Sequence, residues 1–519
     1  MSTSSAMQTA RDLIETLLSR GVREAVLSPG SRSGPVALAL AEADSQGLLR
    51  LHVRIDEREA AFLALGIAKR SGQPVAVLTT SGTAVANLHP AMLEAWHARV
   101  PIIAVTADRP ARLWGTGANQ TTHQTGLLAP VETLSSVREL AESMARSSGP
   151  IHLNLELDQP LITSDEWVFR PPAPNMRDTG PAPEAHTLSC VPATIIVAGD
   201  GAPASIAKIA DEAGWPIIAE PSSNLRSAPT ALALGRLLLT AEPLASRIER
   251  VVSVGHATIS RPVTALLSRR DIEIIHWGDQ STFPVPAGDN VSFVQAINLA
   301  DRPESATWAA EWIDADQRLA ERLEREDTLA ISTAVCQAAG ADSLLMLGPS
   351  QVLRDVDLMM PARTPGPYVI SNRGLAGIDG VLSTAVGAAL AHPGPSIAFV
   401  GDVTFLHGSN GLLAGPLEPK PDLTIVVLND DGGSIFASLE QGDPEFSEHF
   451  ERVYATGQNA SIGALCRGMN VAHELVTVAG LAAALATRPT GVSVVEVRVS
   501  RAHRRALSQS IAQAVQGLF

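Results

Sequence analysis

The feature that most constrains the fold of this chain is a repeated alternation of short apolar runs with helical patterns. In the first third, three apolar runs end in glycine, serine or aspartate, and they read EAVLSPG, PVAVLTTSG and VPIIAVTAD. Residues 56–72, between two of these runs, have helical spacing and close on Gly72. Apolar runs without polar alternation are typical of strands that are buried on both faces. The pattern therefore predicts an α/β fold with doubly wound parallel sheets.

The same alternation returns in two later parts of the chain. A length of 519 residues, 45% of them hydrophobic, is enough for about three cores. A proline-rich stretch at residues 169–186 is typical of a linker. We therefore predict three α/β domains, at residues 1–180, 187–325 and 335–519.

Composition excludes several classes of function. The formal net charge of −15 argues against binding to nucleic acid or to a membrane surface. The three cysteines, Cys190, Cys336 and Cys466, are far apart and have no metal-ligand spacing, which indicates a reducing cytoplasm. We expect neither a secretory signal nor a membrane-spanning helix, because the start lacks a basic region before an apolar block and long apolar runs are absent.

Carboxylates follow two apolar runs in the last third. Asp402 ends SIAFVGD, and Asn429, Asp430 and Asp431 end LTIVVLNDD, before two glycines. Each aspartate taken singly fits a helix cap or a turn. Ligands, however, bind at the carboxyl ends of parallel strands, and neighbouring ends would bring Asp402 and Asp430 close together. Two carboxylates and flexible glycine backbone are suited to Mg²⁺ with diphosphate oxygens.

The whole pattern resembles the metal-binding motif of thiamine-diphosphate enzymes, and this resemblance implies that fold. By that motif, Asp402, Asp430 and the Gly432 carbonyl hold Mg²⁺ or Mn²⁺, while the spacing leaves Asn429 as an alternative ligand. The family also places a glutamate beside the cofactor pyrimidine ring, and here Glu57 stands at that position. Ile378 matches the apolar residue that keeps the cofactor bent. The resemblance further implies a homodimer or a dimer of dimers, with the cofactor between subunits.

Arginines in several motifs indicate the kind of substrate. Taken singly, each fits a solvated or structural role. Together, at predicted strand ends, they indicate substrates with several carboxylates, because a guanidinium pairs with a carboxylate in a fork-like geometry. The polar residues of these motifs are Ser31, Arg32, Arg109, Asn119, Gln120, Ser350, Arg354 and Arg373.

These motifs together resemble the 2-succinyl-5-enolpyruvyl-6-hydroxy-3-cyclohexene-1-carboxylate synthase family of menaquinone biosynthesis. The match includes PGSRS, DER, TSGTAVAN, TADRP, GANQ, SNRG and NDDGG, and it is weak in the middle domain. The resemblance implies that 2-oxoglutarate loses CO₂ and that the succinic semialdehyde carbanion adds to isochorismate.

The resemblance also implies roles for individual residues. Three residues, Ser350, Arg354 and Arg373, would hold the succinyl carboxylate. The residues facing isochorismate would be Ser31, Arg32, Arg109, Asn119 and Gln120. The pocket would be lined by Ile435, Phe436 and Leu439, and Arg261 would take the place of a lysine that the family often supplies from its middle domain.

Two alternatives stay open at the level of sequence. One is another thiamine-diphosphate 2-oxoacid decarboxylase or an acetohydroxyacid-synthase-like carboligase, which the arginine motifs do not fit. The other is a non-catalytic regulator on the same scaffold, against which the presence of Glu57, Asp402 and Asp430 argues.

Overall fold

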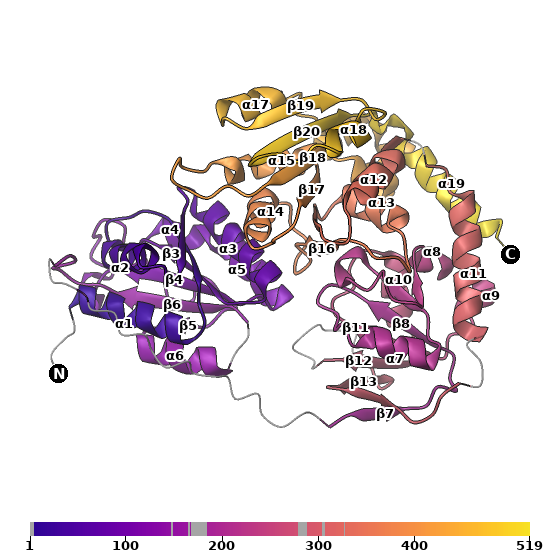
Figure 1. Ribbon diagram of the computed structural model, residues 1–519, viewed down its shortest axis with the longest axis horizontal. Helices are drawn as coiled ribbons and strands as arrows, with labels where there is room; N and C mark the ends of the chain where they lie inside the picture. The colour runs from indigo at the N-terminus through magenta and orange to yellow at the C-terminus, as the bar shows by residue number, and fades with distance from the viewer. Residues whose placement is uncertain are drawn as a thin grey trace. The chain divides into compact units, whose positions relative to one another are not determined.

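The computed structural model describes residues 5–146, 149–163, 167, 184–278, 288–303, 307–325 and 327–518 (Figure 1). The chain forms two compact units. The first consists of Met1–Gly180, Gly377–Pro393 and His407–Asp422, and the second of Pro181–Ala376, Gly394–Leu406 and Leu423–Phe519. The proline-rich stretch predicted as a linker lies almost wholly outside the described residues.

The first unit is built on a six-stranded sheet whose strands run in the order β2-β1-β3-β4-β6-β5, with every pair parallel. Its strands are β1 (Glu24–Leu27), β2 (Arg50–Val53), β3 (Val75–Thr79), β4 (Ile102–Asp108), β5 (Thr133–Leu134) and β6 (Ile151–Glu156). Its helices are α1 (Ala6–Ser19), α2 (Gly34–Ser45), α3 (Glu57–Ser71), α4 (Thr83–Asn87), α5 (His89–Ala98), α6 (Val137–Arg146) and α14 (Val381–Leu390), with short 3₁₀ turns η1 (Ala111–Leu113) and η3 (Ser409–Leu412).

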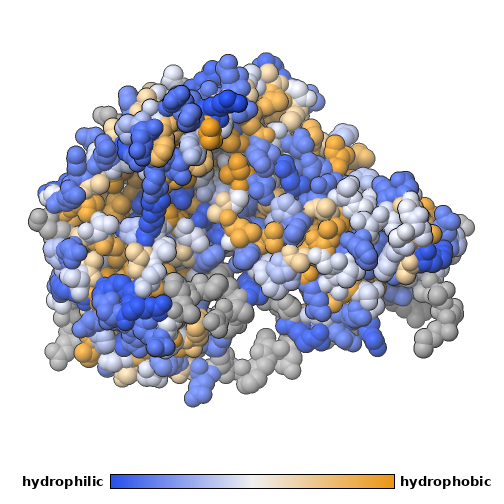
Figure 2. Space-filling model, turned by 180° about the vertical axis from the view of Figure 1, so that it is seen from behind, coloured by the Kyte–Doolittle hydropathy of each residue, from blue (hydrophilic) through white to orange (hydrophobic). Residues whose placement is uncertain are grey.

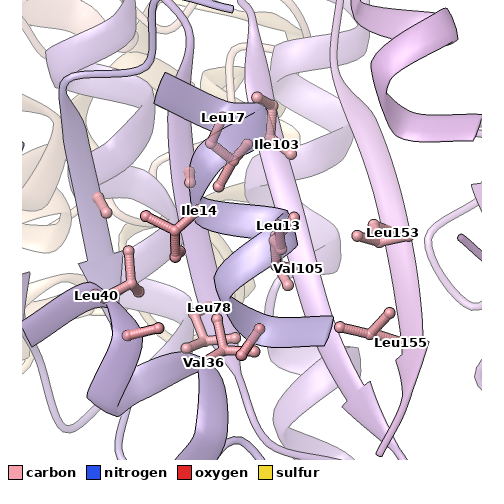
Figure 3. Close-up of a cluster of buried hydrophobic side chains, with 14 of the residues drawn as sticks. Leu13, Ile14, Leu17, Val36, Leu40, Leu78, Ile103, Val105, Leu153 and Leu155 are labelled. Atoms are coloured by element: carbon pink, nitrogen blue, oxygen red, sulfur yellow. The ribbon is translucent and has the colours of Figure 1, made fainter. Parts of the chain in front are cut away.

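The core of this unit forms where α1 covers one face of the sheet (Figure 3). Leu13, Ile14 and Leu17 recur at helical spacing and are at most 1% exposed. They lie over Ile103 and Val105 of the central strand β4. The amphipathic pattern of the sequence thus seats the first helix on the sheet.

Helix α14 belongs to the first unit although it comes from the last third of the chain. It packs against α3 at two glycines. A Cβ atom at Gly66 would lie 2.1 Å from the Thr384 carbonyl oxygen, and one at Gly387 would lie 2.2 Å from the Leu63 carbonyl oxygen. Only glycine allows backbones to approach this closely, so both helices depend on these positions.

The second unit contains two six-stranded sheets, each wholly parallel. The middle sheet has the order β10-β9-β8-β11-β12-β13, and the last sheet has the order β16-β15-β17-β18-β20-β19. The middle strands are β8 (Thr194–Ala198), β9 (Ile217–Ala219), β10 (Ala231–Leu232), β11 (Arg250–Val254), β12 (Glu273–Trp277) and β13 (Val291–Val294), beside the pair β7 (His186–Leu188) and β14 (Ile297–Leu299). The last strands are β15 (Leu344–Leu347), β16 (Tyr368–Ser371), β17 (Ser396–Gly401), β18 (Leu423–Asn429), β19 (Ala472–Val476) and β20 (Val492–Arg498).

Helices cover both of these sheets (Figure 1). Those of the middle part are α7 (Ile206–Ala213), α8 (Gly235–Leu238), α9 (Glu242–Ala245), α10 (Arg261–Leu267) and α11 (Thr307–Arg322). Those of the last part are α12 (Asp327–Ala338), α13 (Gln351–Met359), α15 (Asp402–His407), α16 (Ser447–Phe450), α17 (Ile462–Gly468), α18 (Leu481–Leu485) and α19 (Arg504–Gln516). The second unit also has the short 3₁₀ helices η2 (Pro221–Ser223), η4 (Ser434–Ser438), η5 (Glu440–Gly442), η6 (Pro444–Phe446) and η8 (Arg501–His503), and one π-helical turn, η7 (Glu451–Ala455).

The prediction of an α/β fold with doubly wound parallel sheets is therefore confirmed. One six-stranded sheet lies within each of the three predicted domains, whereas compactness groups the second and third sheets in one unit. The three-domain boundaries stay a prediction. None of the helices in the described ranges has the length and apolar character that crossing a bilayer requires.

Large apolar side chains are exposed at some points of the surface. Figure 2 shows one face of the molecule, where hydrophobic residues lie among hydrophilic ones. In the first unit, Ile55 is 75% exposed and Leu417 is 95% exposed. They flank a polar contact, because Glu418 accepts hydrogen bonds from the Val53 amide at 2.8 Å and from the Arg54 guanidinium at 3.2 Å.

The packing of α3 on α14 leads to a test of stability. Gly66→Ala should lower the free energy of unfolding by about 1–3 kcal/mol or more, because the added methyl group has no space beside the Thr384 carbonyl. Urea denaturation would measure the change. The control is Gly468→Ala at the end of α17, where a Cβ atom would meet no atom within 4 Å. Equal stability of the two variants would contradict the close packing.

Candidate active site

Two buried carboxylates meet at the carboxyl end of the last sheet. Asp402 follows β17 directly, and Asp430 follows β18. These strands pair in parallel, with Gly401 in register with Leu428, so the two aspartates leave the sheet side by side. Asp402 is 4% exposed and Asp430 is 6% exposed. The structure thus places together the pair that the sequence predicts.

The electrostatics of this pair fit a bound cation. Burial raises the pKa of Asp402 to about 7, the neighbouring Asp430 adds to the rise, and backbone N–H groups of Val403 and Gly432 oppose it. Burial also raises the pKa of Asp430, against a hydrogen bond from Ser434 and the charges of Arg504 and Arg501. Two adjacent buried carboxylates are costly unless a positive charge compensates them. The donor set therefore fits a hard divalent cation.

No three His, Cys, Asp or Glu side chains form a metal-binding cluster in the described parts of the chain. A cation at Asp402 and Asp430 would take its other ligands from backbone oxygens and from a bound anion. Gly432 has a φ of +146°, and a Cβ atom there would lie 2.4 Å from the Ala455 carbonyl oxygen. Glycine is therefore required for this turn to pass beside the carboxylates.

Asn429, the alternative ligand, is engaged elsewhere. Its Nδ2 donates to Glu496 Oε1 at 2.7 Å, and its Oδ1 accepts from the Asp431 amide at 3.1 Å. Its side chain therefore stabilises the strand end, whereas the carboxylate of Asp430 lies near Asp402. Of the two candidates, this geometry supports Asp430.

Sequence reasoning missed Arg501, which supports this turn from η8. Its Nη1 donates to the Asp430 carbonyl oxygen at 2.7 Å and to the Asp431 carbonyl oxygen at 2.5 Å. Asp431 has a φ of +52°, a conformation that L-residues adopt at a cost. The two hydrogen bonds from Arg501 hold the turn in this form. The sequence carries no signal for this contact, because 70 residues separate the two partners.

Two guanidinium groups gather at the ends of β15 and β16. Ser350 and Arg354 lie at the start of α13, after β15, and Arg354 Nη1 donates to the Ser350 carbonyl oxygen at 3.0 Å. Arg373 follows the neighbouring strand β16 and is 2% exposed. Burial, first, and the charge of Arg373, second, lower the pKa of Arg354. Arg354 is half-buried and Arg373 is buried, and two neighbouring like charges with little solvent around them favour a bound anion.

The predicted pocket-lining residues lie on the turn after Asp430. Ile435 and Phe436 are in η4 and Leu439 follows it, and all three are half-buried. The predicted middle-domain residue Arg261 opens α10 and is 74% exposed. Its guanidinium forms two hydrogen bonds with Glu440, at 2.5 and 3.0 Å, so it reaches the residue next to Leu439.

The first unit contains the remaining predicted residues. Glu57 opens α3, and its carboxylate accepts a hydrogen bond from Asn87 Nδ2 at 3.0 Å. Asp56 caps the helix through the amides of Arg58 and Glu59, so Glu57 itself does not serve as the cap. Ile378 is half-buried and lies three residues before α14.

The predicted isochorismate residues lie on loops at the carboxyl ends of β1 and β4. Arg32 is 8% exposed and donates to the Leu157 carbonyl oxygen at 2.7 Å. Burial, then the charge of Arg109, lower the pKa of Arg32, so the two guanidiniums lie near each other. Arg109 also donates to the Asn119 carbonyl oxygen at 2.8 Å. Ser31, Asn119 and Gln120 are exposed at this edge.

A buried polar network that the sequence did not reveal supports these loops. Gln124 accepts from the Gly82 amide at 2.9 Å and donates to Asn154 Oδ1 at 2.7 Å. Asn154 donates to Asp108 Oδ2 at 2.8 Å, and Asp108 Oδ1 accepts from the Arg109 amide at 2.7 Å. The loop that carries Arg109 is therefore tied to the strand ends through a chain of buried hydrogen bonds.

Comparison with protein families identifies the class of this chain. Residues 7–127 match the thiamine pyrophosphate enzyme N-terminal TPP binding domain, and residues 352–497 match the corresponding C-terminal TPP binding domain. These matches include Glu57 in the first case and Asp402 and Asp430 in the second. The chain is therefore a thiamine pyrophosphate enzyme.

Curated relatives define the family more narrowly. The chain is 44% identical to the 2-succinyl-5-enolpyruvyl-6-hydroxy-3-cyclohexene-1-carboxylate synthase of Nocardioides sp., over 98% of this chain and 97% of the relative. It is 40% identical to the synthase of the same name from Saccharopolyspora erythraea, over 98% of both chains, and 42% identical to that of Kineococcus radiotolerans, over 99% of both. The chain belongs to the 2-succinyl-5-enolpyruvyl-6-hydroxy-3-cyclohexene-1-carboxylate synthase family.

The geometry after β18 predicts different effects of replacing the two candidate metal ligands, Asp430 and Asn429. Asp430→Ala and Asp402→Ala should abolish Mn²⁺ binding in the presence of thiamine diphosphate, because each removes a carboxylate of the buried pair. Asn429→Ala, the matched control, should retain it. Electron paramagnetic resonance of bound Mn²⁺ and cofactor retention after desalting would measure both properties. Metal loss in Asn429→Ala together with retention in Asp430→Ala would reverse the assignment.

Proposed function

We propose that the chain decarboxylates 2-oxoglutarate and transfers the succinyl unit to isochorismate. The products are 2-succinyl-5-enolpyruvyl-6-hydroxy-3-cyclohexene-1-carboxylate and CO₂, in menaquinone biosynthesis. The observation that carries the proposal is the full-length likeness to synthases of that name, which includes the middle of the chain at 40–44% identity.

The buried carboxylates define how the cofactor would be held. Asp402, Asp430 and the Gly432 carbonyl would bind Mg²⁺ or Mn²⁺, and the ion would neutralise a diphosphate. The raised pKa values of the two aspartates support this role, since a cation would stabilise both in their charged form. When bound, thiamine diphosphate supplies a nucleophilic carbon and an acceptor for the electrons released with CO₂.

Glu57 would act on the cofactor from the first unit. A carboxyl group beside a pyrimidine nitrogen shares a proton with it and favours the tautomer that acts as a base. Asn87 donates to Glu57 Oε2 and so fixes the orientation of the carboxyl group. Ile378 would support the bent cofactor through apolar contact.

The arginine pairs would bind the two substrates. Ser350, Arg354 and Arg373 would hold the succinyl carboxylate, a role supported by the neighbouring guanidiniums of half-buried Arg354 and buried Arg373. A second set would face isochorismate, with Arg32 and Arg109 close together as its charged members. The members of that set are Ser31, Arg32, Arg109, Asn119 and Gln120. The pocket would be lined by Ile435, Phe436 and Leu439, and Arg261 would reach in from the middle domain.

We further propose that the chain works in the cytoplasm as a homodimer or a dimer of dimers, with active sites between subunits. The exposure of Ile55 and Leu417 supports assembly, because large apolar groups next in sequence to the largely buried Arg54–Glu418 pair favour cover by another chain. Free Cys190, Cys336 and Cys466 agree with a reducing compartment.

The role of Glu57 leads to a test that does not depend on turnover. Glu57→Gln should retain the cofactor but exchange its C2 proton with solvent on the order of a hundredfold more slowly, because the amide cannot share a proton in the same way. Proton exchange followed by NMR would measure this. Glu139→Gln, another first-turn helix glutamate of the first unit, is the control. An unchanged exchange rate in Glu57→Gln would remove this residue from the mechanism.

The two arginine sets predict separable defects. Arg354→Ala and Arg373→Ala should slow the reaction with 2-oxoglutarate alone, whereas Arg32→Ala and Arg109→Ala should impair only the step that needs isochorismate. Each loss should be roughly ten- to a hundredfold, since a charge-assisted hydrogen bond contributes about 1.5–3 kcal/mol. Single-turnover CO₂ release, compared with product formation after isochorismate is added, separates the steps.

Two outcomes would count against the proposal. Equal slowing of CO₂ release by Arg32→Ala and Arg354→Ala would contradict separate binding of the substrates. Sustained CO₂ release by the wild-type chain, without any coupling to isochorismate, would favour a simple 2-oxoacid decarboxylase.

A further inference from the structure

A buried glutamate of the middle sheet has a carboxylate that is only half satisfied. Glu220 follows β9 directly and is 4% exposed. Its Oε1 accepts hydrogen bonds from two successive amides, Thr258 N at 2.9 Å and Ile259 N at 2.7 Å. Its Oε2 is buried and makes no hydrogen bond within the described part of the chain. Burying such a group is costly, so its position calls for a functional explanation.

Thr258, whose amide donates to Glu220, also accepts hydrogen bonds from Arg373. Thr258 Oγ1 accepts from Arg373 Nε at 2.9 Å and from Nη2 at 2.5 Å, and the Thr258 carbonyl oxygen accepts from Nη2 at 3.2 Å. Thr258 is therefore fixed at its amide by Glu220 and grips the guanidinium with its two oxygens. This contact joins the middle sheet to the end of β16 in the same unit.

Several charged groups lie near Glu220. Burial raises the pKa of Glu220 to about 7, with Arg373 opposing the rise and Asp357 adding to it. The negative charge of Glu220 also acts on Arg354. A small cavity, with room for about one water molecule, is lined by Glu220 and by Arg226, Arg236, Ser260 and Asp357. Arg226 Nε in this cavity is also buried without a partner among the described residues.

A second carboxylate in this region forms ion pairs with two of these arginines. Asp357 pairs with Arg226 at 2.5 Å and also with Arg236. Arg236 additionally donates to the Arg354 carbonyl oxygen at 3.5 Å. Asp357, which lies in α13, thus binds Arg226 and Arg236. Glu220 is linked to Arg373 through Thr258.

We propose that Glu220 is a positioning residue for recognition of the 2-oxoglutarate side-chain carboxylate. It fixes the Thr258 turn, and this turn sets the direction of the Arg373 guanidinium. The middle sheet thereby sets the affinity for one substrate without contacting it. This inference rests on the proposed function, because it takes Arg373 as a ligand of the succinyl carboxylate.

The test compares three variants in their use of each substrate. Glu220→Ala should raise the KM for 2-oxoglutarate about tenfold, the equivalent of one lost charge-assisted hydrogen bond, and leave the KM for isochorismate within about twofold. Glu220→Gln should stay within about threefold of wild type, because its amide oxygen still accepts from both backbone amides. Thr258→Val should reproduce the defect of Glu220→Ala, and the double variant should add little to either.

A binding measurement gives a readout that is independent of turnover. Glutarate has the two carboxylates of 2-oxoglutarate but lacks the keto group, so it binds without reacting. Calorimetric titration of the intact protein with glutarate should show about tenfold weaker binding in Glu220→Ala and near-normal binding in Glu220→Gln. This comparison separates the inference from the proposed function. Failure of the wild type to form product would reject the function, whereas equal glutarate binding by wild type and Glu220→Ala would reject the role of Glu220.

A matched control excludes a merely structural effect. Asp316 is also a buried carboxylate of this unit, at 1% exposure, and it also accepts from two successive amides, Leu234 N at 2.7 Å and Ala233 N at 3.2 Å. Asp316→Ala should lower the melting temperature but leave the KM for 2-oxoglutarate and the glutarate affinity within about twofold. A defect in 2-oxoglutarate binding as large as that of Glu220→Ala would overturn the proposal. So would a Glu220→Gln variant as impaired as Glu220→Ala.

Discussion

The parallel pairing of β17 with β18 is the constraint on which the site of the last sheet depends. In register, these strands bring Asp402 and Asp430 to one buried place, where the charge of Asp430 adds to burial in making Asp402 harder to ionise. Like charges in a region of low dielectric are tolerated only where a cation or several donors compensate them. The glycine turn and Arg501 shape the backbone around that place. The ends of these two central strands therefore carry the charges that a bound cation would compensate.

In the first unit, a segment from the last third of the sequence packs with residues from the first third. Helix α14 joins α3 because Gly66 and Gly387 let the two backbones touch, and the surrounding alanines leave no bulk between them. Glu57 is the first residue of α3 and Ile378 lies three residues before α14, so two predicted cofactor residues stand at the starts of helices that pack against each other. Small residues thus determine how closely the helices beside these predicted cofactor residues approach each other.

The middle sheet contributes more than a connection between the cofactor-binding parts. Glu220, Thr258 and Arg373 form a continuous path of hydrogen bonds from β9 to the end of β16. The contact of Arg261 with Glu440 is a second link to the last part of the chain, but it is exposed and therefore weak. The buried path through Glu220 and Thr258 is better able to fix the orientation of the Arg373 guanidinium, because solvent does not screen its hydrogen bonds.

The strand pattern of the fold and the meeting of the two key aspartates can be predicted from the sequence alone. Continuous apolar runs predict the buried parallel strands, and the rule that such strands share one edge predicts that Asp402 and Asp430 meet. The tertiary structure alone decided three other features: Asn429 is engaged by Glu496, α14 packs in the first unit, and Glu220 holds the turn that grips Arg373. The reason is physical. Strand periodicity is a local property of neighbouring residues, whereas hydrogen-bond partners and burial are set by residues tens to hundreds of positions apart, which the sequence does not place beside one another.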